Sequence, residues 1–228
     1  MSHKILSLLL CTICTMPLCF AADEEEATPK RTPAQIMSYR GAPWLERSTR
    51  DEEEQPYKVI GAMKLKEGDV VADIGVGTGY YARKIARVVG AKGTVYGVDV
   101  QPEMLEMLVE FCERQQIENI KPILGEFDDP KLPKESLDWI ILTDVYHEFS
   151  HPEAMLAKML EALKPTGKVL LLEYRLDGET ARHIKIDHRM SVKQVKSEWL
   201  PAGFELLELE EFLPTQHLFI FGKAKPKE

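Results

Sequence analysis

The residues best suited to chemistry form a glycine-rich turn that follows a short apolar segment of the chain. Its glycines follow the pattern G-x-G-x-G, at Gly75, Gly77 and Gly79. Glycine tolerates tight backbone conformations and lets a ligand approach the main chain closely. Dinucleotide-binding turns instead use G-x-G-x-x-G and hold a pyrophosphate at the start of the next helix. Here Asp73 precedes the turn, and its charge opposes a pyrophosphate but suits a ligand that bears a positive group.

A second carboxylate follows the turn at a distance typical of nucleoside recognition. Asp99 lies 20 residues beyond Gly79, at the end of the next apolar segment. A carboxylate at this place can accept hydrogen bonds from both hydroxyl groups of a ribose. The glycine turn and Asp99 together therefore predict a ligand that contains a ribose.

Polar side chains that could act on a substrate follow two later apolar segments. Asp144, Tyr146 and His147 follow one of them, and Glu173 ends the next. Ligand sites of open α/β sheets lie at the carboxyl ends of the strands, so we expect these residues near the glycine turn. A histidine with a near-neutral pKa can serve as a base or bind the substrate, and Glu173 can orient the substrate. Structural roles stay open, with His147 as a capping or surface residue and Glu173 paired with Arg175.

The histidines do not predict a metal site, because none has a metal-ligand spacing with a cysteine. His147 and His151 do match the pattern H-E-x-x-H, which binds zinc when a helix places both histidines on one face. Ser150 and Pro152 predict a loop that leads into a helix instead. We therefore expect no zinc hydrolase. His188 lies in an insertion, residues 176–190, that we expect to cover the site or to serve a structural role.

Alternating strand and helix patterns must position these residues. Such alternation predicts βαβ units, and hence a mostly parallel sheet with helices on both faces. The expected strands lie at 70–74, 94–98, 120–124, 137–142 and 169–173, with helices at 80–89, 102–116 and from 152. A turn is expected at 164–167, before the last of these strands.

The two ends of the chain depart from this alternation. After a helix at 191–200, strands at 204–213 and 218–224 predict an antiparallel hairpin at the sheet edge. The fold class is therefore α/β, with a Rossmann-like sheet of seven mostly parallel strands. Before the first strand, Asp51 is expected to cap one helix that continues to Met63.

The motifs resemble those of class I S-adenosylmethionine-dependent methyltransferases, over roughly residues 57 to 224. Residues 70–79 and Asp99 resemble motif I and the acidic motif after it. Residues 138–142 and 163–169 resemble the fourth-strand motif and the turn into the fifth strand. More narrowly, the chain resembles leader-bearing bacterial methyltransferase-domain proteins, at residues 42–47, 128–130, 145–148 and 213–217.

The resemblance implies S-adenosylmethionine as the cofactor. The three glycines of the turn would then line its methionine and ribose part. Asp73 would lie near its amino group, Asp99 would accept the ribose hydroxyls, and Val100 would pack on adenine. Asp144, after the fourth strand, is also expected to contact the cofactor.

The acidic residue that contacts adenine is less defined, because the loop after the third strand is longer than usual. Glu126 and Asp128 both match the expected position, and Phe127 stands between them. We favour Asp128. The alternative is that this acidic loop is only solvated.

The implied reaction is an in-line displacement that moves a methyl group from a sulfonium to an acceptor. Much of its rate can come from holding the two reactants in line, so the family has no universal catalytic residue. His147, Tyr146 and Glu173 are the catalytic candidates. Because the chain has no separate substrate domain, we expect a small or medium-sized acceptor molecule.

Composition agrees with one globular domain and disfavours some partners. The chain has 228 residues, of which 44% are hydrophobic and 29% charged, and its net charge is −8. Broad nucleic-acid binding needs clustered Lys and Arg, so we expect no nucleic-acid partner. The sequence leaves the oligomeric state open.

The first residues have the features of an export signal. Residues 5–20 carry no charge, follow Lys4, and are too few for a comfortable membrane span. Small residues at the expected positions allow cleavage after Ala21. We therefore divide the chain into a signal peptide (1–21), an acidic linker and N-terminal arm (22–56) and the methyltransferase domain (57–228). The mature protein is expected in the periplasm or outside the cell, without a stable membrane span.

Three alternatives remain from these data. The leader could stay uncleaved as an N-terminal membrane anchor. The protein could be a non-catalytic exported ligand-binding module that retains the fold, because the cofactor is made in the cytosol. A nicotinamide-dependent oxidoreductase is disfavoured by the glycine spacing and the terminal hairpin.

Cys112 would be the one cysteine left after cleavage, so we expect a buried thiol and no intramolecular disulfide.

Overall fold

The computed structural model describes residues 32–178 and 182–225. The expected signal peptide and the first part of the acidic linker lie outside these residues. Within the described ranges, no helix has the length and apolar character needed to cross a membrane.

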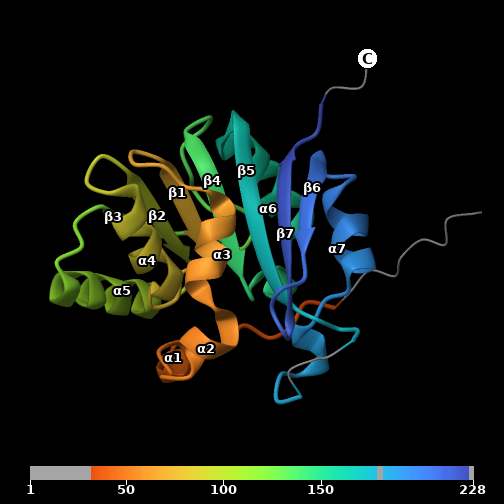
Figure 1. Cartoon of the computed structure of the whole chain (residues 1–228), viewed down its shortest axis with the longest axis horizontal. Helices are drawn as coiled ribbons and strands as arrows, with labels where there is room; N and C mark the ends of the chain where they lie inside the picture. Colours follow the sequence, from red (N-terminus) through yellow and green to blue (C-terminus); the bar gives the residue numbers. More distant parts are fainter. Residues whose placement is uncertain (1–31, 179–181, 226–228) are drawn as a thin grey trace, which may run out of the picture.

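A seven-stranded sheet with the order β3-β2-β1-β4-β5-β7-β6 forms the centre of the molecule (Figure 1). Its first five strands run parallel to one another, and β7 runs antiparallel to both β5 and β6. The predicted fold class and the predicted edge hairpin are therefore confirmed. The strands are β1 (Val70–Ile74), β2 (Thr94–Asp99), β3 (Ile120–Leu124), β4 (Leu137–Thr143), β5 (Leu163–Tyr174), β6 (Phe204–Glu210) and β7 (Gln216–Lys223).

Helices cover both faces of the sheet, as Figure 1 shows. Side chains alternate across a strand, so Val71 and Ala72 of β1 enter different cores. The core around Val71 includes residues of α3, α4 and α5, and the core around Ala72 includes residues of α6 and α7. Cys112 of α5 is buried, as predicted. The helices are α1 (Ala42–Leu45), α2 (Arg50–Glu54), α3 (Pro56–Met63), α4 (Tyr80–Val89), α5 (Pro102–Gln115), α6 (Pro152–Ala162) and α7 (Val192–Trp199).

The single helix expected from Asp51 to Met63 is wrong, because the structure divides it into α2 and α3. Gln55 between them is in the left-handed conformation, with a φ of 43°. Pro56 starts α3 and has no N–H to continue the hydrogen bonding of α2. The residue at the N-cap of α2 is Thr49, so Asp51 lies inside the first turn.

The turn expected at 164–167 is also wrong, because β5 already begins at Leu163. Pairing of β5 with β4 shifts register between Leu137 and Trp139. Gly167 makes this close pairing possible, since a Cβ on it would lie 2.8 Å from the carbonyl oxygen of Leu137. Sequence alone did not separate this irregular strand from a turn.

Candidate functional site: two adjoining cavities

The glycine turn joins β1 to α4 and depends on backbone conformations that favour glycine. Gly75, Gly77 and Gly79 have φ angles of 74°, 51° and 85°. Space is also short: a Cβ on Gly77 would lie 2.7 Å from Cδ1 of Leu45. The turn therefore brings bare main chain to the edge of a cavity, where a ligand can approach it.

Asp99 ends β2 beside this turn, and the backbone holds its carboxylate in place. One oxygen accepts a hydrogen bond from the N–H of Gly77 at 3.0 Å, and the other accepts from the N–H of Gln101 at 2.9 Å. Burial raises the pKa of Asp99 above its usual value, although these N–H groups favour the charged form. Each carboxylate oxygen keeps acceptor capacity for a second donor, which is what a pair of ribose hydroxyls requires.

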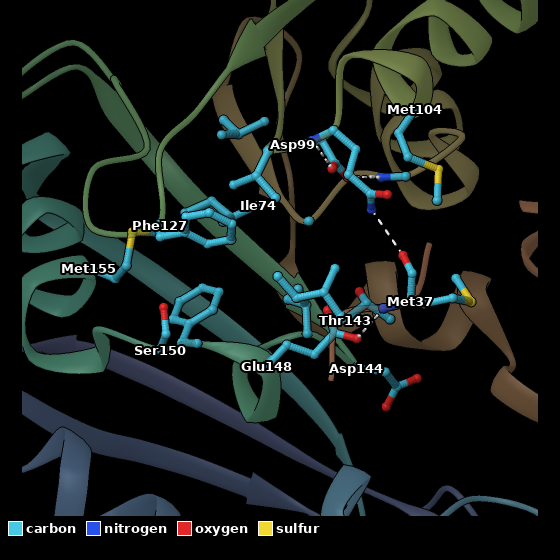
Figure 2. Close-up of a pocket in the computed structure, with 18 of the residues that line it drawn as sticks. Met37, Ile74, Asp99, Met104, Phe127, Thr143, Asp144, Glu148, Ser150 and Met155 are labelled. Atoms are coloured by element: carbon cyan, nitrogen blue, oxygen red, sulfur yellow. Dashed lines mark hydrogen bonds between the residues drawn. The ribbon is translucent and has the colours of Figure 1, made fainter. Parts of the chain in front are cut away.

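Asp99 lines a cavity at the carboxyl ends of β1, β2 and β4, which we call the cofactor cavity. It encloses about 820 Å³, counting the part open to solvent. Figure 2 shows Phe127 and Met155 together at one end, and Met37 and Asp144 at the other. The lining also includes Ile36, Leu45, Gly75, Gly77, Val100, Gln101, Met104, Glu126, Thr143 and Glu148.

Three of the residues predicted to bind the cofactor do not line this cavity. Gly79 caps α4 behind the turn. Asp73 is buried below the turn, where burial raises its pKa to about 7, against the opposing effects of Arg50 and the backbone N–H of Ala82. Asp73 therefore supports the turn from beneath.

The third of these residues is Asp128, which is exposed and points to a different assignment at the adenine end. Glu126 and Phe127 line the cavity from the same loop, whereas Asp128 does not. The structure places Glu126, and not Asp128, on the lining of this cavity. Both acids are exposed and Glu126 pairs with Lys131, so the loop after β3, which has no periodic pattern, gave the sequence no signal to separate them.

A second cavity of about 540 Å³ adjoins the first, and we call it the acceptor cavity. Five residues line both cavities and mark the place where they meet: Met37, Leu45, Thr143, Asp144 and Glu148. The rest of its lining carries rings and charges, from Trp44, Arg47, Arg50, Glu54, His147, Tyr174, Ile184 and His188.

Asp144 stands at this junction in an unusual environment. Its φ is 50°, a left-handed conformation that non-glycine residues seldom adopt. One carboxylate oxygen accepts a hydrogen bond from Nε2 of Gln216 at 2.7 Å, and the other is buried without a partner among the described residues. Burial, with the nearby carboxylates of Glu54 and Glu173, raises the pKa of Asp144 well above its usual value. Sequence reasoning found Asp144 but missed Gln216, because β7 lies 72 residues away.

His147 and Glu173 form a buried pair in this region. The sequence placed both residues after neighbouring strands but did not predict that they pair. Nδ1 of His147 lies 2.6 Å from Oε2 of Glu173. Burial opposes the charged imidazole, but Glu173, Glu148 and Asp144 outweigh it and raise the pKa of His147. Burial also raises the pKa of Glu148 to about 7.

Tyr146, the third catalytic candidate, is placed elsewhere. Its hydroxyl donates to Oε2 of Glu198 in α7 at 2.5 Å, and its ring packs against Trp199. It lines neither cavity. We therefore remove Tyr146 from the candidates, since a 3₁₀ turn over Tyr146–Glu148 directs neighbouring side chains to different sides.

The H-E-x-x-H pattern is not helical, as expected. His147 lies in the 3₁₀ turn, and His151 is the N-cap residue of α6 with its Nδ1 3.0 Å from the hydroxyl of Ser150. His188 of the insertion, unlike His151, packs against His147: the centroids of the two rings lie 5.0 Å apart. The insertion thus reaches the acceptor cavity.

The described part of the N-terminal arm, residues 32–54, lines both cavities. Its backbone is held by the N–H of Ala34 on the carbonyl of His147 at 2.9 Å, and by the N–H of Met37 on Oε1 of Glu148 at 3.2 Å. Trp44 packs edge-on against His183, so the arm and the insertion meet over the acceptor cavity.

A buried cation anchors the end of this arm. Arg50 donates to Oε1 of Glu54 at 2.8 Å and to the carbonyl of Leu45 at 2.7 Å, and it lies over the ring of Tyr80. Nearby, Glu46 accepts hydrogen bonds from Thr78 and Arg83 of the glycine turn and α4. These contacts fix the arm to the glycine turn.

Comparison with known proteins agrees with this geometry. A family model described as a methyltransferase domain matches residues 65–213. A structure titled as a SAM dependent methyltransferase from Aquifex aeolicus superposes with a TM-score of 0.77 at 25% identity, covering 82% of this chain and 98% of that one.

Curated relatives match over a shorter stretch. A protein-L-isoaspartate O-methyltransferase of Pyrococcus horikoshii is 36% identical over 107 residues, which are 47% of this chain and 45% of that protein. The ubiquinone/menaquinone biosynthesis C-methyltransferase UbiE of Pseudomonas putida is 30% identical over 111 residues, 48% of this chain and 43% of that protein. The chain thus spans about half the length of these relatives.

The matched family region contains the glycine turn, Asp99, His147, which lines the acceptor cavity, and Glu173, which contacts His147. The seven-stranded sheet has the same class I arrangement that the sequence resemblance implied. We conclude that this chain belongs to the methyltransferase-domain family.

Proposed function

We propose that this protein transfers the methyl group of S-adenosylmethionine to a small or medium-sized acceptor in the acceptor cavity. The observation that carries the proposal is Asp99, whose two oxygens are fixed by the backbone beside a glycine turn and which lines a cavity together with that turn. The match to the methyltransferase-domain family supports the same reaction.

The residues present fit this cofactor. Asp99 would accept the ribose hydroxyls, and Gly75 and Gly77 would admit the ligand against bare main chain, with Val100 at the adenine ring. Phe127 offers an apolar ring at the far end, with Glu126 as acceptor for an amino group. When bound, the cofactor supplies an electrophilic methyl group on a sulfonium.

The chain's own residues position the acceptor and exclude water. Asp144 and Glu148 bring carboxylates to the junction of the cavities, and Met37 and Leu45 cover it with apolar surface. Holding a nucleophile in line with the methyl group at this junction supplies much of the rate. Glu173 orients His147, whose ring lines the acceptor cavity.

The acceptor is proposed to be a small molecule and not a nucleic acid. The acceptor cavity has a volume of about 540 Å³ and lies between the arm and the insertion. The net charge of −8 disfavours a polyanionic partner. Aromatic and charged residues around the cavity favour a polar ring or a comparable compact group.

Calorimetric titration of the purified protein with S-adenosylmethionine and S-adenosylhomocysteine tests the first half of the proposal. We expect micromolar binding that is lost in Asp99→Ala and kept in Glu113→Ala, which removes an exposed acid of α5. Thermal unfolding of each variant shows whether it is folded. No binding by a folded wild-type protein would overturn the proposal in favour of an exported module with another ligand.

We further propose that the protein is exported and cleaved after Ala21. The charge-free stretch at 5–20 and the small residues before the cleavage position support this proposal. Mass spectrometry of the mature protein from cell fractions should find an N-terminus at residue 22 outside the cytosol. Full-length protein in the cytosol contradicts export, and full-length protein in the membrane fraction indicates an anchor.

A further inference from the structure

We propose that His147, Glu148 and His188 bind one divalent transition-metal cation in the acceptor cavity. The proposal deepens the proposed function and rests on it for the role of the cation, although binding itself can be tested alone. The three residues each offer a ligand atom, and these atoms all lie within 4.8 Å of one another. All three line the acceptor cavity.

Separate parts of the fold bring these ligands together. His147 and Glu148 belong to the 3₁₀ turn after β4, and His188 ends the 3₁₀ turn Ile186–His188 of the insertion. Two ligands of one ion at about 2.1 Å lie at most about 4 Å apart, so binding draws the three slightly together. His188 is the side chain that moves, because it sits on the surface segment and is 22% exposed.

Both histidines are oriented as metal ligands are. Nδ1 of His147 lies 2.6 Å from a carboxylate oxygen of Glu173, and Nδ1 of His188 lies 2.9 Å from one of Asp187. Histidine ligands of metals are typically held by a carboxylate in this way, which fixes the ring and makes it a better donor. Nε2 is then the ligand atom that each ring offers.

The carboxylates around the acceptor cavity also favour a cation. Glu54, Asp144 and Glu148 line it, and Glu173 lies directly behind His147. One oxygen of Asp144 and one of Glu54 are buried without a partner among the described residues. A buried carboxylate oxygen without a partner is costly, and a cation nearby lowers that cost.

The guanidinium groups of the cavity do not offset these carboxylates fully. Arg47 bonds to Glu53 and Glu54, and Arg50 bonds to Glu54. Within the described part of the chain, the side chain of Asp144 receives the neutral amide of Gln216 on its other oxygen. A dication beside Glu148 therefore complements the remaining negative charge.

The ligand set indicates the kind of ion and its use. Two imidazole nitrogens and one carboxylate suit zinc, iron or manganese better than magnesium or calcium, and three protein ligands leave coordination positions open. An oxygen of the acceptor can take an open position. We therefore infer an acceptor that carries a hydroxyl or phenol group, held by the cation at the junction with the cofactor cavity.

Calorimetric titration of chelator-treated protein with Zn²⁺ alone tests the site, with the absorption spectrum of added Co²⁺ as a second measurement. We expect saturable binding of one ion per chain. Glu173→Gln, which removes a support and not a ligand, should weaken binding about 10- to 100-fold. His188→Gln and Glu148→Gln should weaken it further and change the Co²⁺ spectrum. His151→Asn, at an exposed histidine nearby, should leave binding unchanged.

The same preparations titrated with S-adenosylhomocysteine separate this proposal from the proposed function. Cofactor binding without saturable Zn²⁺ binding overturns the metal site and keeps the methyltransferase. Zn²⁺ binding without cofactor binding keeps the site and overturns the proposed reaction. Zn²⁺ binding that His188→Gln leaves intact but His151→Asn removes also overturns the site.

Discussion

The side-chain amide of Gln101 donates a hydrogen bond of 2.9 Å to the backbone carbonyl of Met37, and both residues line the cofactor cavity. The oxygen of the same amide accepts from the N–H of Tyr39, also at 2.9 Å. One side chain after β2 therefore fastens the N-terminal arm beside Asp99, and Figure 2 shows the bond to Met37.

Gln101→Ala should loosen the arm and weaken cofactor binding. Each lost hydrogen bond is worth about 1 kcal/mol, so we expect S-adenosylhomocysteine affinity to fall about tenfold or more. Calorimetry measures this change, and limited proteolysis of the arm should become faster. Gln115→Ala removes an exposed amide bonded to Arg87 and serves as the control. Equal affinity and equal proteolysis in both variants would show that the arm does not depend on Gln101.

The assignment of the adenine end predicts a difference between two neighbouring acids. Glu126 lines the cofactor cavity and Asp128 does not, so Glu126→Gln should weaken binding of S-adenosylhomocysteine by about 1 kcal/mol. Asp128→Asn should leave the affinity unchanged. Titration of the two variants side by side is a matched comparison, because both remove one charge from the same loop. The reverse result would restore Asp128 as the adenine contact.

Asp73 should make stability depend on pH. The usual pKa of its carboxyl is 3.8. In the folded protein, burial and the nearby Asp99 raise this pKa to about 7, against the opposing effects of Arg50 and the N–H of Ala82. The folded state therefore holds the proton more tightly than the unfolded state. The contribution of Asp73 to stability is full below pH 4, is lost as the pH rises to 7, and is constant above that.

Asp73→Asn removes this titration. The free energy of unfolding of the variant, measured relative to that of the wild type, should therefore increase between pH 4 and 7. The two pKa values correspond to a gain of about 4 kcal/mol at most. Urea unfolding of both proteins at several pH values measures it, with Asp69→Asn as a control at a turn outside the cavities. A difference that stays constant across this range would contradict the raised pKa.

Removal of the buried cation Arg50 should destabilise the fold strongly. Arg50→Met leaves buried Glu54 with Arg47 in place of two charged partners and removes the positive charge that favours ionised Asp73. Breaking a buried pair in this way costs about 3–5 kcal/mol. Lys92→Met, at a surface pair with Glu67, should change stability by less than about 1 kcal/mol. Similar urea midpoints for both variants would refute the structural role of Arg50.

The sequence predicted those elements whose pattern is local. The strand at Val70–Ile74 and the helix at Tyr80–Val89 have the expected bounds, because apolar periodicity and glycine define them without help from distant residues. The break at Gln55 was missed, since charged and apolar residues continue a helical period across it. Pro56 was the available signal.

The same rule applies to the site: the sequence predicted residues that lie close together along the chain and missed those that are distant. Asp99 and the glycine turn follow one another closely along the chain, so spacing revealed them. Gln216 and the arm reach the cavities across long sequence distances, and no spacing rule connects them to Asp144. The cluster of His147 and His188 could not be found from the sequence either, because their 41-residue separation matches no metal-binding pattern. Only the packing of the insertion shows that they are neighbours.

The arm and β7 come from opposite ends of the described chain, yet both complete the same pair of cavities. A growing chain on the ribosome therefore carries the glycine turn and Asp99 long before it can make Gln216. Until the last strand is synthesised and inserted between β5 and β6, Asp144 lacks its partner and the sheet lacks two of its strands. The surroundings of Asp144 at the junction of the cavities are thus complete only after the C-terminal strand has been added.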